Sequence, residues 1–349
     1  MQRWVSQAHL GRSVGMVIPA YFSDKPEDAL VLDLLRMTLG DCPSYVSLDH
    51  VCVVVDGDER TARIAAQVRD ELLSAGCGSF RLLPLAENHG KLWATRVGIR
   101  ALMDVHAELE WVVIRDGDGD HVVSDMPRLV QAGMVLRAEY GHANLLVIGS
   151  RQSRSRPMGW WRGELEHLLD GVTLDALAYA LAGQGRALNL RHCIDLSAPD
   201  LSSGYKVYGR ELAQELFLRN EPHYGLLAPN AYWHYGPETT MVVDGILGGA
   251  VLAEVTRLAW DGQPASSFGE FRLLSLYGEL MAWVLERLEI PLRVGLQWID
   301  NRAPSLALHT DGRGQEFIAR LREHVVDLVE AHRGQAEPAP APASSLPFF

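Results

Sequence analysis

Apolar runs with the length of buried strands alternate with helix-like segments over the first 150 residues of the chain. The strand-like runs cover residues 14–19, 51–55, 80–85, 111–114 and 144–149. The helix-like segments between them cover residues 28–39, 61–73 and 90–103. Strands that alternate with helices form a mainly parallel sheet with helices on both faces. The runs show no polar alternation, which agrees with burial of both faces, so the predicted fold class is α/β.

Three aspartates, Asp116, Asp118 and Asp120, alternate with glycines directly after the fourth apolar run, in the sequence DGDGDH of residues 116–121. Carboxylates packed this closely repel one another unless a hard cation lies among them, and Mg²⁺ or Mn²⁺ fits oxygen ligands. The calcium-loop spacing fails, because His121 and Pro127 stand where glycine and glutamate are needed. A solvated acidic turn that caps a helix near residue 124 is the alternative. A cation at a strand end can hold a diphosphate, which indicates nucleotide chemistry.

Composition and charge exclude several classes of protein. The 349 residues are 48% hydrophobic and 22% charged, so the chain can bury one large core or two modest ones. The formal net charge of -12 argues against broad nucleic-acid binding. No apolar run reaches the roughly 18 residues needed to span a bilayer, and the first 12 residues lack a signal-peptide core. We expect a cytoplasmic protein, with peripheral membrane contact and oligomer formation left open.

Basic and aromatic segments add three weaker signals, each with two interpretations. Lys91 follows Gly90 at a predicted helix start, where it can reach a phosphate or simply lie on the surface. The segment 150–162 contains Arg151 and Arg162 and is either a solvated loop or an anion clamp. His234 lies in the sequence YWHY and is either a late metal ligand or a packed ring.

A series of short motifs resembles the family 2 glycosyltransferases of the GT-A fold, and is most similar to their polyprenyl (dolichyl) phosphate mannose synthase-like branch. The resemblance spans residues 14–268. Its motifs are VIPAY at 17–21, VVDG at 54–57, GK at 90–91, the acid turn at 116–121, GSR at 149–151, DLSSGYKVY at 200–208, and EV at 254–255 followed by Gly262 and Ser266. Asp120 stands where the synthases carry glutamine, and Val55 where many members carry an aspartate.

The resemblance implies a GT-A (Rossmann-like) fold and a metal-dependent hexosyl transfer from a UDP- or GDP-linked sugar to a phosphate-bearing or hydroxyl acceptor. By family analogy we expect the transfer to be of the inverting type. Its implied donor-binding residues are Pro19, Tyr21, Asp56, Lys91 and Asp116. Its implied metal ligands are Asp116, Asp118 and Asp120, to which His234 is added as a candidate. Its implied acceptor-binding residues are Arg151, Arg162, Ser203 and Lys206. A hydroxyl acceptor needs a general base, for which Glu238 and Asp200 are the candidates; Glu238 alternatively only begins a helix.

The same resemblance suggests how the chain is divided. An N-terminal extension (1–13) is followed by a nucleotide-sugar-binding half (14–150) and an acceptor-binding half (151–265). A C-terminal helical region (266–334), with helices at 268–289 and 316–331, precedes a disordered tail rich in proline and alanine (335–349). The helix at 268–289 can face the core, a partner or a membrane surface.

Two other functions remain open. A sugar-phosphate nucleotidyltransferase uses a similar sheet, but it usually carries a glycine-rich basic loop after the first strand, where this chain has YFSD at residues 21–24. A non-catalytic nucleotide-sugar-binding protein would use the same cleft without turnover.

Overall fold

The structure is a computed structural model of the chain and describes residues 4–22, 26–258, 273–307 and 312–334. Some predicted features fall outside these ranges. They are part of the YFSD segment, Gly262 and Ser266, the first residues of the helix predicted at 268, and the tail at 335–349.

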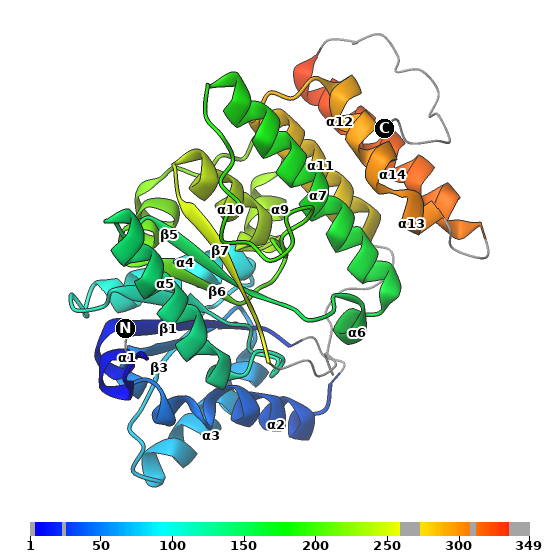
Figure 1. The fold of residues 1–349 in the computed structure, drawn as a ribbon. Coiled ribbons are helices and arrows are strands. Elements are labelled where there is room, and N and C mark those ends of the chain that lie inside the picture. Colours follow the sequence, from blue (N-terminus) through cyan, green and yellow to red (C-terminus); the bar gives the residue numbers. More distant parts are fainter. Residues whose placement is uncertain (1–3, 23–25, 259–272, 308–311, 335–349) are drawn as a thin grey trace.

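Seven strands of the described chain form one sheet in the order β3-β2-β1-β4-β6-β5-β7 (Figure 1). Their bounds are β1 Val14–Ala20, β2 Val51–Val55, β3 Arg81–Pro84, β4 Trp111–Ile114, β5 Leu145–Ser150, β6 Lys206–Gly209 and β7 Val251–Thr256. Only β6 runs antiparallel to its neighbours, β4 and β5. All other neighbouring pairs are parallel, so the predicted mainly parallel α/β sheet is confirmed.

Alternate residues of the central strands pack into two separate cores, one on each face of the sheet. Val53 and Val113 belong to one core, with side chains of α2, α3 and α5. Val54 and Val112 belong to the other, with side chains of α4, α7, α10 and α11. Because both faces are covered, the strands need no polar alternation, as the sequence predicted.

The helices agree with the predicted positions and add several that the sequence did not reveal. The long helices are α1 Gln7–Ser13, α2 Asp28–Leu39, α3 Glu59–Ser74, α4 Lys91–Met103, α5 Met126–Tyr140, α7 Trp160–Gly183, α10 Pro237–Leu247, α11 Leu273–Arg287, α12 Leu292–Arg302 and α14 Arg313–Arg333. Short turns of helix are η1 Cys42–Ser44, η2 Leu48–His50, η3 Val123–Asp125, α6 Ser155–Met158, α8 Arg210–Gln214, η4 Glu215–Arg219, α9 Pro229–His234 and α13 Pro304–Ala307.

The C-terminal helices pack as a layer beside the sheet. Figure 1 shows α7, α11, α12 and α14 side by side, and each of them contributes to the core that contains Val54. Met281 and Trp283 of α11 are fully buried, so the described part of the helix predicted at 268–289 faces the core. None of the described helices combines the length and the apolar character needed to cross a bilayer. Strand β5 ends at the predicted boundary at residue 150, and its two neighbours in the sheet, β6 and β7, come after that boundary in the sequence. The division into two halves stays a prediction.

Candidate active site

The acidic residues singled out in the sequence lie at the carboxyl ends of two parallel strands, β2 and β4, that flank β1. Asp56 follows β2 directly, and Asp116 comes two residues after β4 ends. Strand β1 pairs with both β2 and β4. The next two strands in the sequence, β2 and β3, lie on one side of β1, and the strand after them, β4, lies on its other side. In open α/β sheets this switch in strand order is where ligands bind.

A buried arginine closes the turn formed by residues 116–121. The Arg115 side chain is fully buried, and its Nε donates to the carbonyl oxygen of His121 at 3.0 Å; its Nη2 donates to the same oxygen. In the opposite direction, the backbone N–H of Asp116 donates to His121 Nδ1 at 3.0 Å. Gly119 adopts a φ of +85°, which a side chain would strain. The turn is therefore held in one conformation from both of its ends.

His121 is a buried, neutral ring whose free nitrogen carries a proton. Its burial, together with the positive charge of Arg257, holds the pKa of the imidazole well below its ordinary value. Since Nδ1 accepts the hydrogen bond from Asp116, the proton of the neutral ring is on Nε2. One ligand atom each of Asp116, Asp120 and His121 lie within 4.8 Å of one another. The imidazole nevertheless presents an N–H there, so it suits a hydrogen-bond donor better than a metal ligand.

Asp120 is a carboxylate of the turn with a buried oxygen to which no described residue donates a hydrogen bond. Its Oδ1 is buried and accepts no hydrogen bond from any residue that the structure describes, although His121 Nε2 lies 3.4 Å away. Burial, followed by repulsion from Asp118 and Asp116, raises the pKa of Asp120 well above its ordinary value. The backbone N–H of Asp120 contacts Asp118 Oδ1 at 3.5 Å. A buried carboxylate oxygen without a donor, crowded by two further carboxylates, is the environment that a divalent cation would stabilise, so the residues fit Mg²⁺ or Mn²⁺.

Lys91 joins the acid turn to Glu238. Lys91 is the first residue of α4, and its Nζ lies 2.7 Å from Asp116 Oδ1 and 2.5 Å from Glu238 Oε1. Burial alone would lower the pKa of Lys91, but the two carboxylates outweigh it and raise the pKa. Burial alone would raise the pKa of Asp116, but the ammonium of Lys91 outweighs it and lowers the pKa. The ammonium and the Asp116 carboxylate are therefore both charged at neutral pH.

The start of α4 is fixed by Asp56. The two carboxylate oxygens of Asp56 accept the backbone N–H groups of His89 at 2.9 Å and Gly90 at 2.7 Å. Gly90 has a φ of +104°, and a Cβ there would lie 2.4 Å from the carbonyl oxygen of Trp233. Asp56 therefore acts in the structure by placing Lys91, and the nucleoside contact predicted for it stays a prediction.

Two further glycines leave room beside the Lys91 bridge. A Cβ on Gly204 would lie 2.7 Å from Asp116 Oδ2 and 3.1 Å from Lys91 Nζ. Gly236 precedes α10 with a φ of +85°, and a Cβ there would lie 2.3 Å from Glu238 Oε2. Glu238 is in the first turn of α10, as its helix-start interpretation requires, and it also faces Lys91.

Two of the predicted acceptor-binding residues, Arg151 and Arg162, are both paired with Glu166. Arg151 donates to both carboxylate oxygens of Asp200, with Nε 2.9 Å from Oδ2 and Nη2 2.5 Å from Oδ1, and it pairs with Glu166 at 2.7 Å. Burial alone would raise the pKa of Asp200, but Arg151 outweighs it and lowers the pKa. Arg162 lies 3.3 Å from Glu166. These contacts hold the segment around Asp200 in place.

Ser203 and Lys206 are also satisfied within the protein. Ser203 Oγ donates to the carbonyl oxygen of Gly149 at 2.6 Å. Lys206 Nζ is buried and donates to the carbonyl oxygen of Leu201 at 2.9 Å and to that of Ser203. The acceptor-binding roles of these two residues, and of Arg151 and Arg162, stay predictions; their contacts are those of a supporting framework.

The remaining predicted residues border the acid turn or lie apart from it. Pro19 is in β1, and its carbonyl oxygen would be 3.2 Å from a Cβ on Gly117. Tyr21 follows β1 and is exposed. His234 is exposed, and its ring nitrogens contact the carbonyl oxygen of Asn230 and Asn88 Oδ1. His234 is not in the ligand group of the acid turn, and its metal role stays a prediction.

Arg257 is the site residue that sequence reasoning missed most completely. It follows β7 and is 4% exposed, and among the described residues its buried Nε and Nη1 have no hydrogen-bond partner. Its positive charge lowers the pKa values of both Asp120 and His121, so it contributes to the electrostatics of the acid turn. A single arginine after a strand carries no recognisable spacing. Arg115 offered a signal, because a charged residue directly after an apolar run is unusual.

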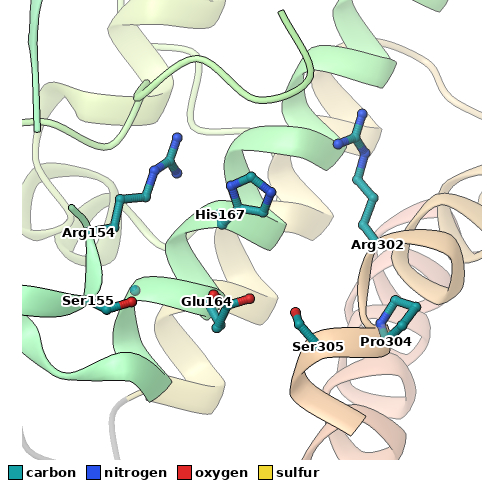
Figure 2. Close-up of a pocket in the computed structure, with 8 residues that line it drawn as sticks. Arg154, Ser155, Glu164, His167, Arg302, Pro304 and Ser305 are labelled. Carbon is teal, nitrogen blue, oxygen red and sulfur yellow. The ribbon is translucent and has the colours of Figure 1, made fainter. Parts of the chain in front are cut away.

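A separate pocket of about 480 Å³ lies between α7 and the segment that joins α12 to α13. Figure 2 shows Arg154 and Arg302 on opposite sides of it, with His167 between them. Arg154 is paired with Asp170 at 2.6 Å, and Arg302 with Asp175 at 2.6 Å. None of the acid-turn residues lines this pocket, and both of its guanidinium groups are already bound by carboxylates.

Comparisons with known proteins add a likeness in fold. No protein-family model matches the chain, and no curated protein matches it. The structure is similar to the mannosyltransferase PcManGT from Pyrobaculum calidifontis, solved with GDP-Man and Mn²⁺, with a TM-score of 0.49 and 15% identity over 94% of this chain and 90% of that one. It is also similar to GalNAc-T7, solved with UDP, GalNAc and Mn²⁺, with a TM-score of 0.38 and 12% identity over 89% of this chain and 55% of that one. With TM-scores below 0.5, neither likeness carries an argument about the reaction of this chain.

Proposed function

We propose that this chain is a metal-dependent glycosyltransferase of the GT-A type, which transfers a sugar from a nucleoside diphosphate sugar to an acceptor hydroxyl. The observation that supports it most directly is the Lys91 ammonium held between Asp116 and Glu238, beside three crowded carboxylates. The family 2 assignment is part of the proposal and rests on the motifs of residues 14–268.

Asp116, Asp118 and Asp120 would hold Mg²⁺ or Mn²⁺. When bound, such an ion neutralises the negative charge that develops on the departing nucleoside diphosphate. Lys91 adds a positive charge at the same place, since its carboxylate partners keep it protonated. His121 Nε2 offers one more donor, and Arg257 offers a buried guanidinium with two unused nitrogens. These groups suit a diphosphate, which is recognised by clustered cations and N–H donors.

Glu238 is the stronger candidate for the general base. Asp200 has both oxygens bound by Arg151 and a lowered pKa, which makes it a poor proton acceptor. Glu238 lies next to the acid turn, and a carboxylate there can accept the proton of an attacking hydroxyl. A base on the acceptor side agrees with a single displacement and inversion at the sugar carbon.

A hydroxyl acceptor is favoured over a phosphate acceptor by the state of the arginines. A phosphate needs cationic donors that are free to bind it. Arg151 is occupied by Asp200 and Glu166, and Lys206 by two backbone carbonyls. A phosphate would have to displace buried partners, whereas a hydroxyl needs only Glu238.

The reaction can be tested by incubating the purified full chain with UDP- and GDP-linked sugars, with Mn²⁺ or with EDTA. We expect a nucleoside diphosphate to be released only with Mn²⁺, and faster with a hydroxyl acceptor than with a phosphate acceptor. Release of pyrophosphate would instead indicate a sugar-phosphate nucleotidyltransferase. Donor binding without turnover for any acceptor would indicate a non-catalytic nucleotide-sugar-binding protein.

A further inference from the structure

Two histidines and two carboxylates gather at the amino ends of the parallel strands. Asp49 and His50 belong to η2, which leads directly into β2. His106 and Glu108 belong to the connection between α4 and β4. The acid turn lies at the carboxyl ends of the same strands. A five-residue strand such as β2 is about 17 Å long, so this cluster is on the opposite edge of the sheet from the candidate active site.

The ligand atoms of the cluster converge. Glu108 Oε1 is 3.1 Å from His50 Nε2 and 3.0 Å from His106 Nδ1. Asp49 Oδ2 is 4.0 Å from His50 Nε2, and the atoms offered by Asp49, His50 and His106 all lie within 4.8 Å of one another. In a tetrahedral zinc site with bonds of 2.0–2.1 Å, neighbouring ligand atoms are about 3.3 Å apart. The separations between Glu108 and the two histidines are therefore close to those that one ion would impose, and the two histidine nitrogens lie within 4.8 Å of each other.

Among the described residues, the carboxylates of the cluster pair with no permanent positive charge, although Arg210 Nη1 donates to the backbone carbonyl oxygen of His106 at 2.9 Å. Within the described chain, the ion pairs of Asp49 and Glu108 are with the two histidines and with no lysine or arginine. The side chain of His50 is 7% exposed, and its buried Nδ1 has no hydrogen-bond partner among residues 4–22, 26–258, 273–307 and 312–334. The polar contacts of this buried ring are thus all within the cluster. Two carboxylates beside two imidazoles leave two negative charges for a cation to balance.

We propose that Asp49, His50, His106 and Glu108 form a second metal site, which binds a divalent transition metal of the Zn²⁺ type. Two imidazole nitrogens and two carboxylates are ligands that zinc accepts in tetrahedral geometry. Imidazole distinguishes this site from the acid turn, whose oxygen ligands favour Mg²⁺ or Mn²⁺. The two sites therefore select different ions.

The bound ion would fasten the start of β2 to the α4–β4 connection. His50 and Glu108 are 58 residues apart in the chain, so one ion closes a long loop. A ligand that binds the folded chain and not the unfolded one stabilises the fold by mass action. The site would act on stability and leave the chemistry of the acid turn unchanged.

The test uses the full chain, stripped with EDTA, returned to metal-free buffer and titrated with Zn²⁺. We expect one tightly bound zinc per chain by elemental analysis and a rise in Tm of roughly 5 °C at a hundredfold excess over Kd. Titration with Co²⁺ should produce the visible absorption bands of a tetrahedral site. Absence of zinc from the wild-type chain would overturn the proposal without any variant.

Variants then locate the ion. His106→Gln, in a half-buried ring, and Glu108→Gln, in an exposed carboxylate, should each abolish the Tm rise and the cobalt bands. The exposed His142→Gln is a matched control that should keep both. The double variant D116N/D120N should still bind zinc. If that double variant loses the zinc, or if His106→Gln binds it as tightly as the wild type, the ion is not held by this cluster.

Discussion

The ammonium of Lys91 lies 2.5 Å from the carboxylate of Glu238, although 147 positions separate the two residues in the chain. The same ammonium reaches Asp116 at 2.7 Å. Lys91 begins a helix after β3, and Glu238 begins a helix late in the chain, so each group comes to the site on a helix start. In the proposed function, this contact joins a cation on the donor side to a carboxylate on the acceptor side.

Replacing Lys91 should show whether the positive charge of its ammonium is needed for activity. We expect Lys91→Met to lower kcat/KM by about a hundredfold or more, since it removes a positive charge aimed at the leaving group. It would also leave Asp116 and Glu238 without their shared partner. Lys91→Arg keeps the charge and should retain part of the activity. Steady-state kinetics with varied donor measures the effect, and an unchanged kcat/KM in Lys91→Met would rule out this role.

Glu238→Gln tests the base. The amide keeps the size of the side chain and a contact with Lys91 but cannot accept the proton of the acceptor. We expect kcat to fall by about a hundred- to ten-thousandfold, with little change in donor affinity. Asp200→Asn is the matched comparison. If it lowers kcat while donor affinity and Tm are kept, and Glu238→Gln does not, then Asp200 is the base.

Much of the fold could be predicted because its central strands are short, β-branched and apolar. Val51–Val55 and Trp111–Ile114 have the bounds that the sequence predicted. Strand β6 was missed because its four residues include Lys206 and Gly209. That lysine can be buried because its ammonium donates hydrogen bonds to two backbone carbonyl oxygens, and no local sequence pattern reveals these bonds.

The site could be predicted in part for the same reason. Asp116 and Lys91 stand at element ends, where local patterns locate them. Gly204 and Arg257 matter only through residues that are distant in the sequence. Gly204 lies against Asp116, and the charge of Arg257 affects the pKa values of Asp120 and His121. Neighbours of this kind depend on the packing of β6 and β7, which the sequence did not show.

Asp118→Ala should remove metal-dependent turnover and leave the fold intact. The three carboxylates of the turn share one cation in the proposed function, so the loss of one should reduce activity with Mn²⁺ by at least about a hundredfold. The control is Asp104→Ala, which replaces an exposed aspartate at the end of α4 and should keep full activity. Donor hydrolysis and Tm are measured together. Full activity in Asp118→Ala would exclude this residue as a ligand.

Asp170 should make stability depend on pH. Burial raises its pKa to about 6, against the opposing effect of Arg154. Between about pH 4 and pH 6 the folded chain keeps a proton that the unfolded chain has released, so the contribution of Asp170 falls as pH rises through this window and is constant above it. The free energy of unfolding of the wild type, relative to Asp170→Asn, should fall by about 2 kcal/mol from pH 4.5 to pH 7. Urea unfolding at several pH values measures it, and a constant difference would contradict the pKa assigned to Asp170.

Arg257 should affect stability and activity in opposite directions. Its buried Nε and Nη1 have no hydrogen-bond partner in the described part of the chain, so the free protein carries the desolvation cost of a guanidinium without the bonds that would offset it. Arg257→Met should therefore leave Tm unchanged or raise it. The same change removes a cation beside Asp120 and His121, and we expect KM for the donor to rise about tenfold or more, with Arg257→Lys intermediate. Thermal unfolding and donor kinetics on the same preparations decide the matter: a variant that loses stability and keeps its KM would show that Arg257 supports the fold and does not bind the diphosphate.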